Sequence, residues 1–248
     1  GSDGLFVAET EDGAPRRARA VVVAAGAFQE PAVPSLARGF SDGVVQLTAA
    51  TYRNPRQLPR APVLVAGDGA TGRQVALELA ADREVWLATG RPRVVTAQRI
   101  LGRDQLWWSE RLGLLRASRR SPVGRLVRRL DAFPGPHLRL PALRKRGVRV
   151  VGRVVGARGR AALVDGGRAL EIDAVIWATG YRERTDWLDL PAAKDAGGRI
   201  VEHRGVSPEP GLYFVGREWQ WSRGSALVCG VGRDAAWLAR RVADWLAA

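Results

Sequence analysis

Cysteine and histidine are nearly absent from this 248-residue chain, and methionine is missing altogether. Cys229 is the only cysteine, which excludes an intramolecular disulfide, a CxxC redox pair and a cysteine-based zinc site. The two histidines, His137 and His203, lie far apart in the sequence, so a histidine-rich metal site is excluded and a Ser/His/Asp triad has almost nothing to draw on. The sequence therefore points away from zinc enzymes, dithiol reductases and triad hydrolases.

Long apolar runs are absent too. No stretch of 18 apolar residues occurs, and no charged-then-apolar leader precedes the first apolar segment. We therefore expect a cytoplasmic protein with no membrane partner. The missing methionine allows either an excised initiator or a chain that starts inside a longer gene, and the first residues favour the second.

Lysine is scarce, although the net charge is +14 and the sequence pI is about 11.4. Among the 39 basic residues only Lys145 and Lys194 are lysines. A nucleic-acid-binding surface would cluster its cations, because each neutralised phosphate releases counterions. Here the arginines spread through most of the chain, with the densest part over 116–160. This distribution indicates a bias in residue usage, so we expect no specific nucleic-acid partner, and non-specific contact with polyanions stays open.

One stretch, Ala61 to Arg93, has the pattern of a βαβ unit that holds a dinucleotide. Val63 to Ala66 form a short apolar run, typical of a strand buried on both faces of a parallel sheet. The G-x-G-x-x-G spacing follows at once, with its glycines at Gly67, Gly69 and Gly72. The first glycine permits the tight turn, the second lets a pyrophosphate approach the backbone, and the third lets helix pack on strand.

A helix is predicted after the glycines, over 73–81, with the N–H groups of its first turn directed at the phosphates. We therefore assign Ala70 and Thr71 to the binding loop as well. A second apolar segment, Val85 to Ala88, follows at the expected distance. This context raises the glycine pattern above a chance match in a chain with 29 glycines.

The end of that second segment predicts which nucleotide binds. An NAD-specific site carries an acidic residue about 20 residues beyond the glycines. This chain has Thr89, Gly90, Arg91 and Arg93 there. Because arginine pairs with a 2′-phosphate, we predict that Arg91 and Arg93 select NADPH.

Other elements follow from apolar runs bounded by Gly, Pro and Asp-Gly turns. Gly4–Ala8 and Ala18–Ala24 predict a hairpin or small meander around an Asp12-Gly13 turn, and 40–62 is predicted to be irregular. Short helices are predicted within 94–140. The remaining predictions are a short helix at 140–146, strands at 148–151, 153–157, 161–164, 169–172, 174–177 and 211–216, and a closing helix after Gly230.

Two of the predicted strands end in similar small-residue turns. One is Ala24-Ala25-Gly26 and the other is Ala178-Thr179-Gly180. Such turns let a ligand lie against bare backbone. Gly230 to Ala235 matches G-x-G-x-x-A but no second strand follows it, which predicts at most a helix N-terminus that faces a ligand.

Five segments together resemble a known family: VVVAAGAFQEPAVP, VLVAGDGATGRQVALELA, GRDQLWWSERLGLL, DAVIWATGYR and GVSPEPGLYFVGREWQWSRGSALVCGVGRDAAWLA. From about Gly4 to Trp245 the chain resembles the flavin-containing monooxygenase and Baeyer–Villiger-like flavoproteins, in particular bacterial FAD- and NADPH-dependent oxidoreductases sometimes labelled as linked to potassium transport. The resemblance implies an α/β fold with two dinucleotide-binding domains, in which a Rossmann-like NAD(P) domain is inserted into an FAD domain.

By this resemblance the NADPH-binding domain spans 29–170, and a partial FAD-binding domain consists of 1–28 plus 171–248. Ala25 and Gly26 form one linker turn near the flavin nucleotide, and Thr179 and Gly180 form the other near the nicotinamide. The flavin ring and ribityl chain use backbone N–H groups and a positive helix end. The residues implied to lie beside the flavin are Gly216 and the helix start at Gly230 to Asp234, which includes Gly232.

Two features depart from the family. Relatives begin with their own G-x-G-x-x-G for the FAD pyrophosphate, and this chain has nothing in its place, which implies an N-terminally truncated FAD domain. Relatives also carry a histidine in a Leu-His-x-x-x-Tyr pattern, where this chain has Thr48 between Leu47 and Tyr52. Oxygenation as opposed to simple oxidoreduction therefore stays open.

The implied chemistry is hydride transfer from NADPH to FAD, followed by oxygenation of a small organic substrate. The sequence has no acid–base constellation, so no catalytic side chain is assigned, and the activity of this chain by itself is left open. The alternative is an isolated NADPH-binding module without flavin turnover. The partners implied are the substrate and either a homo-oligomer or a separate N-terminal FAD segment.

Overall fold

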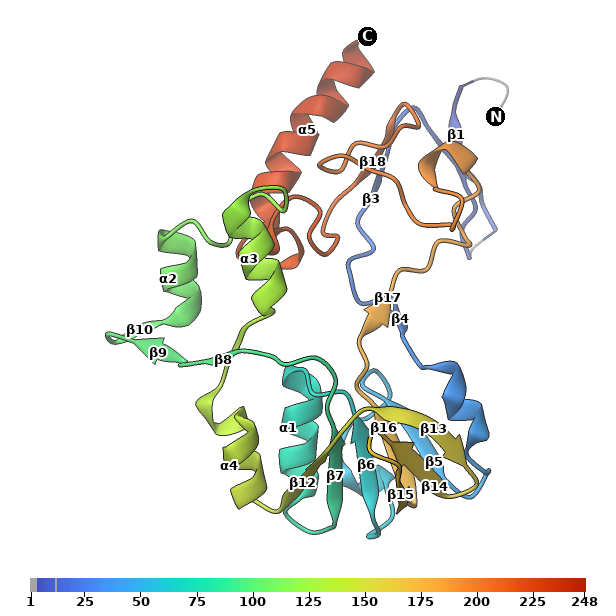
Figure 1. The fold of residues 1–248 in the computed structure, drawn as a ribbon. Coiled ribbons are helices and arrows are strands. Elements are labelled where there is room, and N and C mark those ends of the chain that lie inside the picture. Colours follow the sequence, from blue (N-terminus) through green and yellow to red (C-terminus); the bar gives the residue numbers. More distant parts are fainter. Residues whose placement is uncertain (1–3, 12) are drawn as a thin grey trace. The chain divides into compact units, whose positions relative to one another are not determined.

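The computed structural model describes residues 4–11 and 13–248, and these residues form two compact units (Figure 1). The first, which we call the sheet unit, comprises 30–105 and 130–182. The second, which we call the terminal unit, comprises the described residues up to 29, together with 106–129 and 183–248.

The sheet unit contains most of the strands. Its elements are β4 (Glu30–Pro31), η1 (Ser35–Gly39), β5 (Val45–Thr48), η2 (Pro55–Gln57), β6 (Val63–Ala66), α1 (Ala70–Leu79), β7 (Val85–Ala88), β8 (Val95–Thr96), β9 (Arg99–Ile100), β10 (Arg103–Asp104), β11 (Phe133–Pro134), η3 (Pro136–Leu138), α4 (Leu140–Lys145), β12 (Val148–Val151), β13 (Val154–Arg158), β14 (Ala161–Val164), β15 (Arg168–Glu171), β16 (Ala174–Trp177) and β17 (Tyr181–Arg182).

The terminal unit contains the longest helix. Its elements are β1 (Phe6–Ala8), β2 (Arg16–Ala18), β3 (Val21–Val23), α2 (Gln105–Arg111), α3 (Pro122–Leu130), η4 (Pro191–Ala193), β18 (Leu212–Phe214), η5 (Arg223–Ala226) and α5 (Val231–Ala247).

A parallel sheet of five strands, in the order β12-β7-β6-β16-β5, is the centre of the sheet unit. Side chains alternate along each strand, so neighbours in the sequence enter opposite layers. Val63 and Val65 of β6 pack with α1 and α4, whereas Leu64 and Ala66 pack with the antiparallel β13-β14-β15 sheet and η1. In Figure 1, α1 and α4 accordingly lie on one side of the central sheet and β13 to β15 on the other. Both faces of β6, β7 and β16 are covered, which is why these strands are apolar throughout.

The structure confirms the βαβ unit over β6, α1 and β7. The helix begins at Ala70, earlier than the expected residue 73, because Gly69 is its N-cap. The strands at 148–151, 161–164 and 174–177 have the expected bounds.

Two predictions in the sheet unit need correction. The stretch 40–62 contains β5, which pairs in parallel with β16 as an edge strand. Its Val45 and Gln46 are exposed, so the strand has no apolar pattern by which to find it. Between 94 and 140 the structure adds the two-residue strands β8 to β11 to the expected short helices.

The N-terminal hairpin also differs from its prediction. β1 pairs antiparallel with β2, with Phe6 opposite Ala18, so the second hairpin strand is 16–18. β3 instead pairs in parallel with β18, with Val21 opposite Leu212. Asp12, in the expected Asp12-Gly13 turn, lies outside the described residues. The closing helix is confirmed as α5.

The two units divide the chain differently from the domains implied by the resemblance. The sheet unit begins at residue 30, and the domain bounds implied by the resemblance stay a prediction. However, β16 belongs to the sheet unit because it pairs with both β6 and β5, and 106–129 belongs to the terminal unit. No helix of the described residues has the length and apolarity needed to cross a membrane.

Candidate functional site

The loop after β6 and the first turn of α1 hold three glycines whose surroundings differ. A Cβ atom on Gly72 would lie 1.9 Å from the Gly67 carbonyl oxygen, and one on Gly67, whose φ is +105°, would lie 2.3 Å from the Ala178 carbonyl oxygen. These two glycines are required for the loop to pack against α1 and the end of β16. A Cβ on Gly69 would meet nothing closer than the Arg93 guanidinium carbon, at 4.0 Å. Gly69 therefore borders open space, which lets a ligand approach the backbone.

Helix α1 begins at this open loop. Gly69 is its N-cap and supplies no side-chain cap, and the first N–H groups of any helix have no partner within the helix. Ala70 and Thr71, both assigned from the sequence, contribute two of these N–H groups. The N-terminus of a helix also carries a partial positive charge, so this end of α1 favours an anionic group.

A buried ion pair fixes the shape of the glycine loop. Asp68 is 4% exposed and Arg73 is 2% exposed, and Nη2 of Arg73 lies 2.9 Å from Oδ2 of Asp68. Arg73 also donates from Nε to the Asp68 carbonyl at 2.9 Å and from Nη1 to the Leu138 carbonyl at 3.0 Å. Its guanidinium lies 5.4 Å from the centre of the Phe133 ring. The other Asp68 oxygen accepts from the Gly90 N–H at 3.2 Å.

Sequence reasoning missed Asp68 and Arg73. An unpaired charge at either position would be costly in the interior, so each residue needs the other. Their only sequence signal is the arginine directly after the third glycine, which does not show whether the side chain points inward. The pair joins the glycine loop to the segments after β7 and around η3, and thereby holds the loop in place.

Arg91 and Arg93 follow β7, as the sequence predicted. Both pair with one carboxylate, Asp131, which accepts from Nη2 of Arg91 at 2.7 Å and from Nη1 of Arg93. Nε of Arg93 lies 3.9 Å from Oδ1 of Asp68. Asp131 was not assigned from the sequence, because 38 residues separate it from Arg93.

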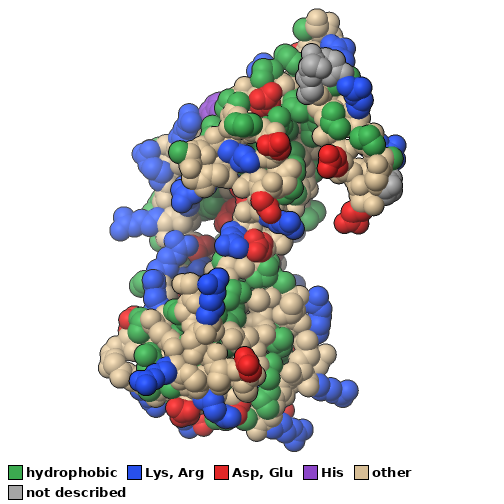
Figure 2. Space-filling view, turned by 90° about the vertical axis from the view of Figure 1, so that its right-hand side faces the viewer, with side chains coloured by type: hydrophobic (Ala, Val, Ile, Leu, Met, Phe, Trp, Pro, Cys, Tyr) green, Lys and Arg blue, Asp and Glu red, His purple; other side chains and the backbone are tan. Residues whose placement is uncertain are grey.

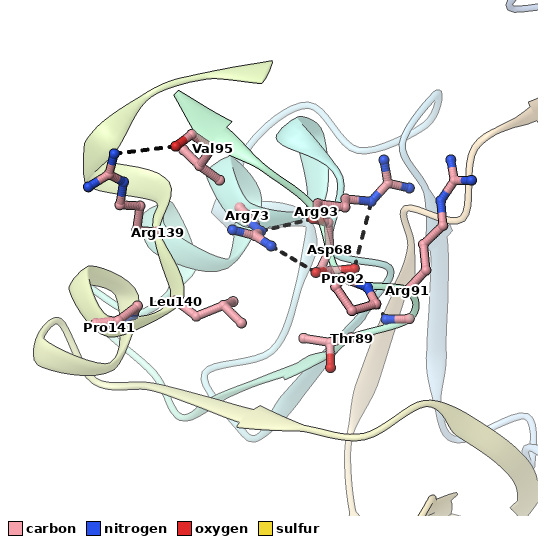
Figure 3. Close-up of a pocket in the computed structure, with 11 residues that line it drawn as sticks. Asp68, Arg73, Thr89, Arg91, Pro92, Arg93, Val95, Arg139, Leu140 and Pro141 are labelled. Atoms are coloured by element: carbon pink, nitrogen blue, oxygen red, sulfur yellow. Dashed lines mark hydrogen bonds and ion pairs between the residues drawn. The ribbon is translucent and has the colours of Figure 1, made fainter. Parts of the chain in front are cut away.

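A cavity of about 450 Å³ opens beside these residues (Figure 3). Figure 3 shows Arg73 and Arg93 on either side of Asp68, with Thr89 below them. Four arginines line the cavity: Arg73, Arg91, Arg93 and Arg139. Apolar side chains, among them Leu140 and Pro141, complete it. We call it the arginine-lined cavity. Its residues surround the carboxyl ends of β6 and β7, where open α/β sheets bind ligands.

The turn after β16 is held by the backbone of the sheet unit. Thr179 donates its hydroxyl to the Ala32 carbonyl at 2.7 Å, and the Ala32 N–H donates to the Gly180 carbonyl at 2.9 Å. Gly180 has a φ of +92°, and a Cβ there would meet no atom within 4 Å. The hydroxyl of Thr179 therefore has a structural partner, and the open backbone is at Gly180.

The sequence-assigned residues Ala25, Gly26, Gly216 and Gly232 belong to the terminal unit. Gly26 and Gly216 follow the paired strands β3 and β18 and have φ values of +74° and +82°. A Cβ on Gly26, Gly216 or Gly232 would meet no atom within 4 Å. The structure thus leaves backbone accessible at the ends of both strands and in the first turn of α5.

One buried carboxylate in that first turn lacks a partner. Asp234 is 5% exposed, and its Oδ2 accepts no hydrogen bond among the described residues. Gly230, the N-cap of α5, has a different role, since a Cβ there would lie 2.4 Å from the Gly224 carbonyl oxygen.

Tyr52, the tyrosine of the family pattern, has a structural role. It is 9% exposed and donates its hydroxyl to Oε2 of Glu78 in α1 at 3.0 Å. Burial, and then the hydrogen bond to Glu78, raises the pKa of Tyr52 above its usual value. Thr48, in the position of the family histidine, lies 3.2 Å from the Thr51 hydroxyl at the end of β5.

Comparison with known proteins gives relatives along nearly the whole chain, although no family model matches it. An uncharacterized oxidoreductase, CzcO, of Bacillus subtilis is 37% identical over 222 residues, which is 90% of this chain and 64% of the relative. A CzcO-like uncharacterized oxidoreductase of Geobacillus kaustophilus is 36% identical over 237 residues, which is 95% of this chain and 68% of the relative. The chain thus spans about two thirds of the length of these relatives.

Solved structures show the same fold. A flavin-containing monooxygenase from Stenotrophomonas maltophilia has a TM-score of 0.76 and 23% identity, and the match covers 98% of this chain and 67% of that one. An ornithine N-hydroxylase from Kutzneria sp. 744, solved with reduced FAD, NADP+ and L-ornithine, has a TM-score of 0.65 and 20% identity over 97% of this chain and 67% of that one. At these identities the likeness establishes the α/β fold with two dinucleotide-binding domains.

Proposed function

The chain belongs to the flavin-containing monooxygenase-like oxidoreductase family, and we propose that it binds NADPH. We further propose that it forms part of an FAD-dependent oxidoreductase that oxygenates a small organic substrate. One observation supports this most directly. The open backbone at Gly69 and the arginine-lined cavity lie at the carboxyl ends of adjacent strands, β6 and β7.

The residues present fit the parts of NADPH. Gly69 leaves space for a pyrophosphate beside the N-terminus of α1, where Ala70 and Thr71 supply N–H groups. Arg91 and Arg93 stand at the end of β7, where the 2′-phosphate of the adenosine ribose is recognised. Arginine is suited to this role because its planar guanidinium donates two parallel hydrogen bonds to a phosphate.

The terminal unit fits part of an FAD site. Its accessible backbone at Gly26, Gly216 and Gly232 allows close approach of a nucleotide. The unpartnered Oδ2 of Asp234 offers an acceptor for a ligand hydroxyl. When bound, FAD would supply the hydride acceptor and the oxygen chemistry. The chain's own contribution is to bind and orient the nucleotides, and we assign no side chain to proton transfer.

An apolar groove of about 400 Å³ on the terminal unit supports completion of the FAD site by a further segment. It is lined by Val22, Val215, Leu238, Val242 and Leu246, among others. The relatives are longer than this chain, which covers 64% of one of them, and the family resemblance implies an FAD-binding segment in the remainder. We propose that an N-terminal FAD-binding segment covers this groove.

Nucleotide titration tests the proposal. Purified protein is titrated with NADPH and NADH by calorimetry, and an absorbance spectrum is recorded before and after FAD is added. We expect NADPH to bind more tightly than NADH. Gly69→Val should abolish this binding without unfolding the protein, because its side chain fills the space for the pyrophosphate.

Gly43→Val is the matched control. Gly43 is exposed, and a Cβ there would meet no atom closer than Ser41 Oγ, at 4.0 Å. It precedes β5 and therefore lies away from the carboxyl ends of the strands. It should bind NADPH as the parent does. Retained binding in Gly69→Val would refute the assignment of this loop.

The alternative function is an NADPH-binding module without flavin turnover. It is favoured by the presence of one complete βαβ nucleotide unit among the described residues, at β6, α1 and β7. The same spectra distinguish the two functions. Bound flavin that NADPH bleaches supports the oxidoreductase, and NADPH binding without flavin supports the module.

The face seen in Figure 2 gives no support to a nucleic-acid function. Figure 2 shows arginine and lysine side chains scattered over the visible face, with acidic side chains between them. Cations in this arrangement do not form the continuous stripe that tracks a phosphate backbone.

A further inference from the structure

The carboxylate of Asp131 occupies the two arginines to which the proposed function assigns the 2′-phosphate. Its Oδ2 accepts from Nη2 of Arg91 at 2.7 Å and also from Nη1 of Arg93. The side chains of Asp131 and Arg93 are each 25% exposed, whereas that of Arg91 is 63% exposed. The contact to Arg93 is thus the more shielded of the two. We call these two pairings the Asp131 contact.

The backbone holds Asp131 in this place. β11 pairs in parallel with β8, with Phe133 opposite Val95. This pairing brings the residues just before β11 beside those just before β8, and Asp131 and Arg93 belong to these two segments. Asp131 follows α3 directly and has a φ of +43°, a conformation that Asp and Asn adopt more readily than other residues with side chains.

Arg93 still has an unused donor. Its Nε is buried and makes no hydrogen bond among the described residues, although Oδ1 of Asp68 lies 3.9 Å away. One Asp131 oxygen thus accepts from both arginines, and Nε of Arg93 is left without a hydrogen bond. A phosphate has three terminal oxygens and can serve Nε and Nη together.

We propose that Asp131 is a specificity-determining residue that competes with the 2′-phosphate of the nucleotide for Arg91 and Arg93. This inference rests on the proposed binding of NADPH. A nucleotide with a 2′-phosphate must displace the Asp131 carboxylate, since two anions at the same guanidinium groups repel each other. A nucleotide with a 2′-hydroxyl leaves the Asp131 contact in place. Asp131 therefore lowers affinity for NADPH selectively.

The Asp131→Asn variant tests this competition. It removes the charge and keeps both the size of the side chain and its tolerance of positive φ. Adenosine 2′,5′-bisphosphate and adenosine 5′-phosphate are the probes, because they differ only in the 2′-phosphate. Two partly exposed ion pairs are worth about 1–2 kcal/mol together, so affinity for the bisphosphate should rise roughly 5- to 30-fold. Affinity for the 5′-phosphate should change less than about twofold.

Glu84→Gln is the matched control. Glu84 pairs with Arg149 in the same unit and precedes β7, whereas the cavity follows β7. This variant changes the net charge equally and should leave both affinities unaltered. The melting temperature of each variant reports whether the fold is kept.

Three outcomes would overturn the inference. If Asp131→Asn and the parent protein bind the bisphosphate with equal affinity, the competition is refuted. If both proteins in that case still bind the bisphosphate more tightly than the 5′-phosphate, the proposed function is kept. Weaker binding of the 5′-phosphate by Asp131→Asn would show instead that Asp131 accepts from the ribose hydroxyl. Absence of binding of both probes to both proteins would refute the proposed function and this inference with it.

Discussion

The buried pair of Asp68 and Arg73 allows a sharp test of how the glycine loop is held. Replacing Arg73 by Met keeps an apolar chain of similar length but leaves the Asp68 carboxylate buried with a hydrogen bond from the Gly90 N–H and with Nε of Arg93 at 3.9 Å. The substitution also removes the hydrogen bonds from Arg73 to the carbonyl oxygens of Asp68 and Leu138 and its contact with the Phe133 ring. Removal of one member of a buried pair costs about 3–5 kcal/mol.

The double variant Asp68→Asn/Arg73→Met should be more stable than Arg73→Met. The amide of Asn carries no charge, so its burial without a guanidinium costs less than burial of the carboxylate. We expect a recovery of about 1–3 kcal/mol, because replacement of a whole buried pair by neutral groups is often close to neutral.

Thermal unfolding followed by circular dichroism measures these effects. A loss of about 3–5 kcal/mol in a unit of this size lowers the melting temperature by roughly 10–20 °C. Hydrogen exchange at the amides of β6 and β7 localises the loss to the sheet unit. A melting temperature for Arg73→Met within about 3 °C of the parent would refute the reasoning, as would a double variant less stable than Arg73→Met.

Three further predictions concern the loop, the nucleotide and pH. Gly72→Ala should unfold the loop region, since its Cβ would lie 1.9 Å from the Gly67 carbonyl oxygen; a parent-like melting temperature would contradict this. Arg93→Gln should lower the NADPH-to-NADH affinity ratio roughly 10- to 100-fold, the worth of a charge-assisted hydrogen bond, and an unchanged ratio in calorimetry would remove Arg93 from the site. Burial raises the pKa of Tyr52 in the folded protein, so its contribution to stability is complete below its unfolded pKa of about 10 and is lost as pH rises above it. Tyr52→Phe should therefore lose less stability between about pH 9 and 11 than the parent does in urea unfolding, and parallel curves would show that Tyr52 does not titrate differently on folding.

Local pattern was sufficient for the elements that are buried on both faces. β6, β7 and β16 are apolar throughout because helices cover one face of the sheet and β13 to β15 cover the other. The same holds for the turn into α1, where only glycine fits at Gly67 and Gly72. These constraints act within a few residues of sequence, so they are visible there.

Edge strands and pairings were less visible. β5 carries polar and exposed residues because it lies at the end of the sheet. The partner of β3 is β18, nearly 200 residues away in sequence, at 212–214, and no local pattern specifies such a pairing. The place of β16 between β6 and β5 likewise follows only from the assembled sheet.

The sequence by itself determined the βαβ unit, its glycine loop and the arginines after β7, because these depend on residue types at short, fixed spacing. Only the tertiary structure decided which carboxylates pair with Arg73 in α1 and with the arginines after β7. Asp68 reaches Arg73 through the turn of the loop, and Asp131 reaches Arg93 through the pairing of β8 with β11. The sequence does not show which opposite charge lies next to a given charged residue, because that depends on the fold. The interaction energy of each pair also depends on how deeply the fold buries it.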